Sequence, residues 1–337
     1  MKILGIESSC DDCAAAVVEN GSRILSNLVA GQIRDHRPYN GVVPEIASRR
    51  HVELIEPVVR QALDEAGISL KEIDGIAVTV EPGLIGSLLV GLSFAKAMAW
   101  SLNLPFIGIN HIYAHLYAVR LEHEVDYPYI GLLVSGGHTI ISKVLDYDKI
   151  EVLGTTIDDA CGEAFDKVAK YYDLGFPGGP AIDKLSRKGN PDAFNFPYPS
   201  LHKGSHRYDV SYSGLKTAVI NQLDKFWNCE YEKTNANIAA SFQRTAIKMI
   251  VNKLKKAVED TGIRNVVAGG GVAANSCLRE LLESEKRFKT LFPSMILCTD
   301  NAAMIAGLGY QYLKRQLHSK FDITPRSRTK IFRKSCS

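Results

Sequence analysis

Residues 2–30, KILGIESSCDDCAAAVVENGSRILSNLVA, predict how the first half of the chain folds. The run KILGIE has the length and apolar content of a buried strand, and the polar letters SSCDD separate it from a second run, AAAVVE. Asn20-Gly21 then divides that run from RILSNLVA, and Asn-Gly between apolar runs is a strong local signal for a β-hairpin. The stretch therefore predicts three strands in a meander.

Helices and strands alternate after the meander. The segment RRHVELIEPVVRQALDEAG places Val52, Ile55, Val59 and Leu63 three or four positions apart and closes on Gly67, as an amphipathic helix does. We expect IDGIAVTV to be a strand, SLLVGLSFAKAMAWSL a helix, PFIGIN a strand and HIYAHLYAVRLE a helix.

The second half repeats this order. We expect YIGLLVS, HTIISKVLD and KIEVLGTT to be strands and ACGEAFDKVAKYY a helix, followed by a loop-rich insert that contains FPGGPAID. The remaining predictions are a long helix (IAASFQRTAIKMIVNKLKKAVEDTG), the strand RNVVAGG, a helix from Asn275, the strand MILCT and the helix NAAMIAGLGYQYLKR. The repeated order predicts two similar α/β lobes facing a cleft, residues 1–125 and 126–316, and a basic tail, 317–337.

Length and composition exclude several protein classes. A chain of 337 residues, 46% hydrophobic and 23% charged, suits a soluble globular protein of about two domains. No run of about 18 apolar residues is present and the chain starts on a strand, so we expect a cytoplasmic protein without a membrane segment. Seven cysteines without paired spacing predict reduced thiols. The net charge of +3 permits a nucleic-acid partner without requiring one.

Residues 111–115, HIYAH, hold a pair of histidines with metal-ligand spacing. His111 and His115 lie one helical turn apart on the same face. Zinc proteases with the HExxH motif share this spacing, but Ile112 stands where their general base would be, so protease chemistry is excluded. The pair is either a packing feature or part of a metal site. Asp300, at the end of the predicted strand MILCT, either caps the next helix or is a third ligand.

Glycine-rich turns are the candidates for phosphate contacts. The turns SSCDD and SGGH close the first hairpin of each lobe, and each is either an ordinary β-turn or a phosphate cradle of backbone N–H groups. GGGVAAN, residues 269–275, loosely fits G-x-G-x-x-A, but no acid follows at the next strand end. It is therefore predicted as a nucleotide contact and not as a Rossmann fingerprint. Gly178-Gly179 either admits a ligand edge or forms a rigid loop.

Ten stretches, in order from residue 3 to 316, together resemble one family, the bacterial tRNA N6-adenosine threonylcarbamoyltransferases (TsaD), formerly misassigned as sialoglycoproteases. They are GIESSCDD, GVVPEIASRRH, PGLIGSLLVG, HIYAH, LLVSGGHT, DDACGEAFDK, FPGGP, YSGLKTA, GGGVAAN and TDNAAMIA. The resemblance implies an actin/Hsp70/sugar-kinase-like (ASKHA) fold of two duplicated RNase H-like lobes around a nucleotide cleft. It also implies transfer of a threonylcarbamoyl group from threonylcarbamoyl-adenylate to N6 of adenosine 37, in tRNAs reading ANN codons, which forms t6A and releases AMP.

The resemblance also assigns site residues and partners. It implies that His111, His115 and Asp300 hold one divalent metal ion, Fe²⁺ or Zn²⁺, and that Asp11 is the acid nearest the transferred group. The implied contacts of the adenylate are Leu133, Val134, Ser135, Gly136, Gly137, Asp166, Gly179, Asp183 and Asn275. The implied partners are tRNA, a catalytically idle paralogue of the same fold and a small ATPase.

Two departures and two rival functions remain. The family commonly has D-E-T where this chain has Asp11-Asp12-Cys13, which leaves any contact by Asp12 open. The basic tail either contacts tRNA phosphates or is a solvated end. The rivals are a small-molecule kinase of the same fold and a nucleotide-gated binding module, neither of which gives HIYAH a metal role. The apolar helix SLLVGLSFAKAMAWSL is either buried on the sheet or, with the preceding helix, an interface for the paralogue.

Overall fold

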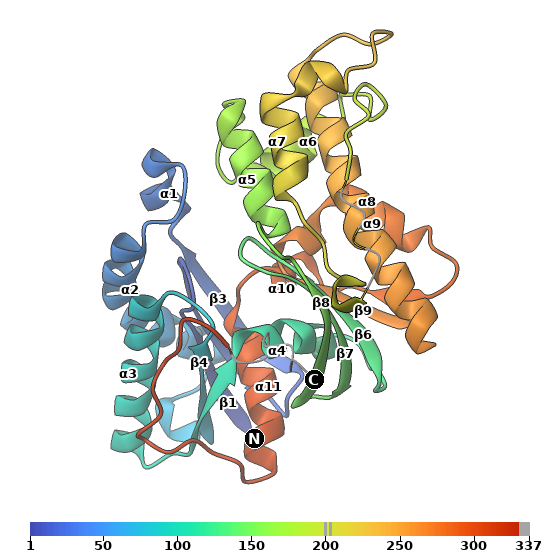
Figure 1. Cartoon of the computed structure of the whole chain (residues 1–337). Coiled ribbons are helices and arrows are strands. Elements are labelled where there is room, and N and C mark those ends of the chain that lie inside the picture. The colour runs from blue at the N-terminus through green and yellow to red at the C-terminus, as the bar shows by residue number, and fades with distance from the viewer. Residues whose placement is uncertain (199–200, 202–203, 330–337) are drawn as a thin grey trace. The chain divides into compact units, whose positions relative to one another are not determined.

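The chain forms two compact units. The structure, a computed structural model, describes residues 1–198, 201 and 204–329. Unit 1 combines Met1–Val125 with the chain from Pro293 onward, and unit 2 is Asp126–Phe292 (Figure 1). The division expected from the sequence differs beyond residue 292, because the last helix, α11 (Ala302–Lys314), packs against the first strands of unit 1.

Unit 1 is built on a five-stranded sheet of order β3-β2-β1-β4-β5. The meander strands pair antiparallel, and β4 and β5 continue the sheet in parallel. Its strands are β1 (Lys2–Glu7), β2 (Asp12–Glu19), β3 (Arg23–Gly31), β4 (Gly75–Glu81) and β5 (Phe106–Asn110). Its helices are α1 (Ile33–His36), α2 (Pro44–Ala66), α3 (Ile85–Leu102), α4 (His111–Tyr117), α10 (Met295–Cys298) and α11, with the 3₁₀ helices Arg37–Tyr39, Leu70–Glu72 and Ala118–Leu121.

The two faces of β1 meet different helices, as alternation along a strand requires. Leu4 and Ile6 belong to the core beneath α2 and α3. On the other face, a Cβ on Gly5 would lie 2.3 Å from the carbonyl oxygen of Ala302, so α11 can approach β1 closely only over a glycine. The turn at Asn20 and Gly21 has positive φ at both residues (53° and 81°), which confirms the predicted hairpin.

Helices α2 and α3 cover one face of this sheet, and α2 corrects a sequence prediction. Val52 is 65% exposed, so it does not belong to the apolar face of α2, which His51 occupies instead. Helix α3 is, among the described residues, the one helix long and apolar enough to cross a membrane. It meets this test by length and composition only, and core helices of globular proteins meet it too. In this fold Leu88 and Leu92 of α3 are buried, and the helix packs on β4.

Unit 2 repeats the sheet topology of unit 1. Its order, β10-β9-β6-β7-β8, again joins an antiparallel meander to two parallel strands. The strands are β6 (Tyr129–Val134), β7 (Thr139–Asp146), β8 (Lys149–Thr155), β9 (Asn265–Gly269) and β10 (Lys289–Leu291). The helices are α5 (Cys161–Tyr171), α6 (Gly178–Ser186), α7 (Ser213–Asn221), α8 (Asn235–Thr261) and α9 (Ser276–Glu283), with the 3₁₀ helices Gly204–His206, Leu223–Lys225 and Gly271–Ala274. The shared order confirms the predicted duplication.

Two predictions of local structure in the second half are wrong. MILCT is not a strand: Met295–Cys298 is the short helix α10, and the fifth strand is β10. FPGGPAID is not all loop, because α6 begins at Gly178. Pro177, which precedes the helix, has the extended conformation of an N-cap.

The described part of the C-terminal tail packs on unit 1. The backbone N–H of Ser319 donates to the carbonyl of Phe106, and Gly108 N–H donates to Ser319 Oγ, so the tail covers the edge strand β5. Arg326 N–H donates to Val80 in turn. A free, solvated end is therefore not found up to Thr329; residues 330–337 lie outside the described part of the chain.

Candidate functional site

The helix α4 carries the two predicted metal ligands and is anchored at its start. Asn110, at the end of β5, accepts hydrogen bonds through Oδ1 from the backbone N–H groups of Ile112 and Tyr113, at 2.9 and 3.3 Å. This is an N-cap, which fixes the direction in which the helix leaves the sheet. His111 and His115 are then buried, at 6% and 1% exposure.

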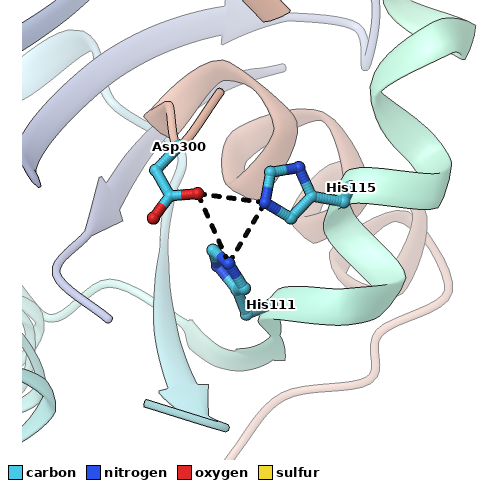
Figure 2. A group of neighbouring side chains, drawn as sticks. All are labelled: His111, His115 and Asp300. Carbon is cyan, nitrogen blue, oxygen red and sulfur yellow. Dashed lines mark hydrogen bonds and ion pairs between the residues drawn. The ribbon is translucent and has the colours of Figure 1, made fainter. Parts of the chain in front are cut away.

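His111, His115 and Asp300 form one group of potential ligands in unit 1 (Figure 2). Nε2 of His115 lies 3.1 Å from Nε2 of His111 and 3.1 Å from Oδ1 of Asp300, while His111 Nε2 lies 3.5 Å from that oxygen. Ligands about 2 Å from a tetrahedral ion lie about 3.3 Å apart, so these three atoms fit one ion such as Zn²⁺ or Fe²⁺. No side chain would have to move far.

Asp300 reaches this group from the segment between α10 and α11, and not from a strand end as predicted. The alternative role as a helix cap belongs to its neighbour, because Asn301 Oδ1 accepts the backbone N–H of Met304 at 3.0 Å. The carboxylate of Asp300 faces the histidines (Figure 2).

Glu7, which sequence reasoning missed, lies behind His111. It is fully buried at the end of β1. Its Oε2 atom is 3.0 Å from His111 Nδ1 and accepts a 2.6 Å hydrogen bond from Thr79 Oγ1, and its Oε1 atom accepts the Ser9 N–H at 2.5 Å. The signal in the sequence was an acid ending an otherwise apolar strand, which is unusual for a buried position.

The carboxylates of Glu7 and Asp300 control the charge of the histidines. Burial alone would lower the pKa of His111, but Glu7 and Asp300 outweigh it and raise this pKa to about 9. Burial raises and His111 lowers the pKa of Glu7, which ends below its usual value. Burial and the adjacent His111 lower the pKa of His115. The two carboxylates therefore stabilise a positive charge at the histidines, either a proton on His111 or a bound cation.

Asp11 and Asp12 lie in and after the turn between β1 and β2. Burial and the nearby Asp300 and Asp11 raise the pKa of Asp12 to about 7. Burial and the same two carboxylates also raise the pKa of the Cys10 thiol well above its usual range, so a redox-active C-x-x-C is not supported. This turn thus brings acids close to the His–His–Asp group.

The SGGH turn of unit 2 is open on one side. Ser135 N–H donates to the carbonyl of His138, and Ser135 Oγ accepts the His138 N–H, which closes the turn. A Cβ on Gly136 or Gly137 would meet no atom within 4 Å, and within the described chain neither N–H donates a hydrogen bond. Leu133 and Val134 are buried in β6, so a ligand at this turn could contact only their backbone atoms.

Close contacts at two further glycines bring other segments of unit 2 to this turn. A Cβ on Gly162 would lie 2.8 Å from Gly136 Cα, and one on Gly270 would lie 2.4 Å from the carbonyl oxygen of Val134, so α5 and the β9–α9 loop both touch the turn. Gly178 N–H donates to Asp166 Oδ1 at 2.7 Å, which ties the start of α6 to α5. Gly179, like Gly137, has open space at its Cβ position.

Asp183 on α6 and Asn275 before α9 are joined by a hydrogen bond. Asn275 Oδ1 caps α9 by accepting the Leu278 N–H, while its Nδ2 donates to Asp183 Oδ1 at 3.2 Å. Asp183 Oδ1 also accepts from Ser276 Oγ at 2.7 Å. Gln243, buried on α8 and absent from the sequence predictions, accepts from Asn275 Nδ2 at 2.9 Å. All the predicted residues of unit 2 thus belong to four connected segments: the end of β6 with the turn that follows it, α5, α6 and the N-cap of α9.

Comparison with known proteins gives one consistent family. Residues 23–307 match the family model described as tRNA N6-adenosine threonylcarbamoyltransferase. The protein of that name from Treponema denticola is 66% identical over 334 residues, 99% of each chain. The one from Treponema pallidum (strain Nichols) is 55% identical over 99% of this chain and 95% of its own.

Solved structures show the same fold at low identity. The ROK hexokinase from Thermus thermophilus is 14% identical over 94% of this chain and 100% of its own, with a TM-score of 0.52. The HypF of T. kodakarensis is 17% identical over 94% of this chain and 48% of its own, with a TM-score of 0.64. These likenesses concern the fold alone, and they confirm the ASKHA fold expected from the sequence.

Proposed function

This chain belongs to the tRNA N6-adenosine threonylcarbamoyltransferase family, and we propose that it transfers the threonylcarbamoyl group of threonylcarbamoyl-adenylate to N6 of adenosine 37 in tRNAs reading ANN codons, forming t6A and releasing AMP. One observation supports this function over its rivals: a chain of this family contains three buried or half-buried metal donors in one group. A small-molecule kinase or a nucleotide-gated binding module would leave that group without a purpose.

The metal ion of the proposed enzyme is one Fe²⁺ or Zn²⁺ held by His111, His115 and Asp300. Three protein ligands leave a coordination position open for a substrate oxygen. When bound, such an ion acts as a Lewis acid that polarises a carbamoyl or phosphate oxygen. The burial of both histidines supports this proposal, because a cation held there is shielded from bulk water and acts more strongly on nearby oxygens.

The adenylate is assigned to unit 2. The N–H groups of Gly136 and Gly137 donate to its phosphate, for which the open turn leaves room. The remaining predicted contacts, Asp166, Gly179, Asp183 and Asn275, lie on the segments tied to that turn, with Leu133, Val134 and Ser135 forming its start. Carboxylate and amide side chains are suited to the hydroxyl groups of a ribose.

Asp11 is the proposed catalytic residue. The acceptor amine of adenosine is a weak nucleophile that loses a proton during acyl transfer, and a carboxylate can accept that proton or orient the threonyl group. Asp11 lies in the β1–β2 turn between Cys10 and Asp12, and Asp300 raises the pKa of both of these neighbours. This proximity supports its assignment to the transferred group.

The proposed partners are tRNA, a catalytically idle paralogue of the same fold and a small ATPase, and the proposed location is the cytoplasm. The idle paralogue is assigned to the exposed apolar side chains of α2 and α3, which include Val52, Leu89 and Trp100. Exposed large apolar groups gathered on adjacent helices are typical of interfaces.

The decisive experiment supplies the purified chain with threonylcarbamoyl-adenylate and a tRNA that reads an ANN codon, with and without the two protein partners. Mass spectrometry of the digested nucleosides should detect t6A, and AMP should appear in equal amount. The matched control is the same tRNA with guanosine at position 37, which offers no N6 amine. Failure to form t6A in the complete mixture, or phosphorylation of a small molecule by ATP, would refute the proposed function.

A further inference from the structure

Glu7 has three hydrogen-bond partners in the interior of unit 1. Ser9 N–H donates to one oxygen, and Thr79 Oγ1 and His111 Nδ1 approach the other at 2.6 and 3.0 Å. The side chain is fully buried, and the ring of His111 lies within hydrogen-bond distance of it. A buried carboxylate needs such donors, because an unpaired charge in the interior is very costly.

The chemistry of the carboxylate determines how the ring of His111 is protonated. An ionised carboxylate accepts hydrogen bonds and cannot donate them, so Nδ1 of His111 must carry a proton to bond Glu7. When a cation binds in place of the second ring proton, the imidazole is neutral with one protonated nitrogen, which leaves the lone pair on Nε2. Nε2 is the atom that lies 3.1 Å from His115 Nε2 and 3.5 Å from Asp300 Oδ1.

We propose that Glu7 is a positioning residue of the metal site: it holds His111 in the Nδ1–H form and at a fixed ring orientation, so that Nε2 is the ligand atom. The inference rests on the metal site of the proposed function. Carboxylates that bond the second nitrogen of a ligand histidine orient the ring and strengthen the ligand. Nothing in the sequence pairs residue 7 with residue 111, because they meet only in the folded sheet.

His115 provides an internal contrast. Its Nε2 atom faces the same group, but its buried Nδ1 atom has no hydrogen-bond partner within the described chain. His111 is thus the histidine with an oriented ring, and the effect of Glu7 should be confined to it.

The variant Glu7→Gln should move the ring proton of His111 from Nδ1 to Nε2, while the side chain at position 7 keeps its shape. The backbone N–H of Ser9 is a fixed donor, so it retains the amide oxygen and the NH₂ group must face His111 Nδ1. An NH₂ group donates, and the Ser9 hydroxyl, 3.3 Å from Nδ1, can donate as well, so Nδ1 is expected to accept and the ring proton to move to Nε2. The ligand atom is then blocked. The matched control is Thr79→Val, which removes a donor to the same carboxylate but leaves its charge and its bond to His111.

The test titrates the metal-free full-length protein with Zn²⁺ by calorimetry. We expect Glu7→Gln to bind Zn²⁺ about 10- to 100-fold more weakly than the wild type, and Thr79→Val to bind it nearly as well. Circular dichroism shows whether each variant is folded. If wild type and folded Glu7→Gln bind Zn²⁺ equally, the role of Glu7 is refuted while the metal site stands. If the wild type binds no Zn²⁺, both proposals fail.

A second measurement needs no variant. In the Zn²⁺-loaded wild type, ¹⁵N–¹H correlation spectra of the histidine rings should show a protonated Nδ1 and a metal-bound Nε2 at His111. A protonated Nε2, or metal on Nδ1, would overturn the inference even if Glu7→Gln failed to fold.

Discussion

The carboxylate of Asp183 on α6 accepts a 3.2 Å hydrogen bond from the side-chain amide of Asn275, the residue that caps α9. The two residues are 92 positions apart in the chain. Each also fixes a backbone group, because Asp183 accepts from the Ser276 N–H and Asn275 from the Leu278 N–H. A ligand that bonds either side chain would thus meet groups whose positions are already set, which reduces the entropy lost on binding.

Asp183→Asn should weaken AMP binding. The amide oxygen can take the place of Oδ1 and still accept from Ser276 N–H and Asn275 Nδ2, but these bonds lose the charge of the carboxylate, and the NH₂ group faces the guanidinium of Arg187. We expect a loss of about 1 to 3 kcal/mol in the free energy of unfolding, and about tenfold weaker AMP binding by calorimetry. Asp192→Asn, at an exposed acid paired with Arg244, is the control and should change neither quantity. Reduced stability with unchanged AMP affinity would make the pair purely structural.

Gly137→Val should impair nucleotide binding more than stability. Its Cβ position is empty to 4 Å, so the fold tolerates a side chain, but a valine would occupy the space proposed for the phosphate. AMP affinity should fall at least about tenfold while the melting temperature stays within a few degrees. The contrasting variant is Gly162→Ala, whose methyl group would lie 2.8 Å from Gly136 Cα and should destabilise unit 2. Equal AMP affinity for Gly137→Val and wild type would exclude the turn from the binding site.

Local sequence patterns predicted most of the fold. The Asn20-Gly21 hairpin, the strand meanders and the Gly67 end of α2 all follow from turn chemistry and periodicity. MILCT was misassigned because a short apolar run is compatible with either a strand or a buried helical turn. In the fold Leu297 and Cys298 are buried, whereas Met295 and Ile296 are exposed, a pattern set by the helix.

Long-range pairing limited what the sequence could say about the site. The spacing of HIYAH gave the histidine pair, but the choice of Asp300 as third ligand came from a family resemblance, and the alternative of a helix cap was resolved only by Asn301. Glu7 was missed because its partners, Thr79 and His111, lie on other strands and helices. Such residues carry no periodic signal, since their positions depend on which strands become neighbours.

His115→Ala should remove most of the bound metal. It deletes one of three donors and leaves the other two about as far apart as before. We expect at least about tenfold weaker metal binding and a loss of about 1 to 3 kcal/mol in stability, since the side chain is buried. Elemental analysis of the purified proteins measures the first and urea unfolding the second. His123→Ala, at an exposed histidine, is the control. Equal metal content in the two variants would rule out the proposed site.

Asp12→Asn should stabilise the metal-free protein at high pH. The pKa of Asp12 is about 7 in the fold against an ordinary value of 3.8. Below about pH 4 the carboxyl is protonated in both states, but from there to about pH 7 it ionises only on unfolding, so stability falls as pH rises. The penalty is at most about 1.4 kcal/mol per pH unit in that range. Urea unfolding after metal removal should therefore show a larger advantage of Asp12→Asn at pH 8 than at pH 4.5. The same advantage at both values would contradict the raised pKa.

Leu89→Glu should prevent binding of the idle paralogue while leaving the fold intact. Leu89 on α3 is 53% exposed, so a carboxylate there remains solvated in the free protein. Burying it in an apolar interface would cost several kcal/mol, which corresponds to a loss of affinity of at least about 100-fold. Phe94, the other position on α3 that the sequence suggests, is a poorer choice because it packs against the core of unit 1.

Ile296→Glu, at a 59% exposed side chain on α10, is the matched control for a charge on an exposed apolar site. Pull-down with the purified paralogue measures binding, and circular dichroism confirms folding. If folded Leu89→Glu still binds the paralogue as the wild type does, the surface of α3 is not the interface; if both variants lose binding, the loss reflects added charge and not this helix.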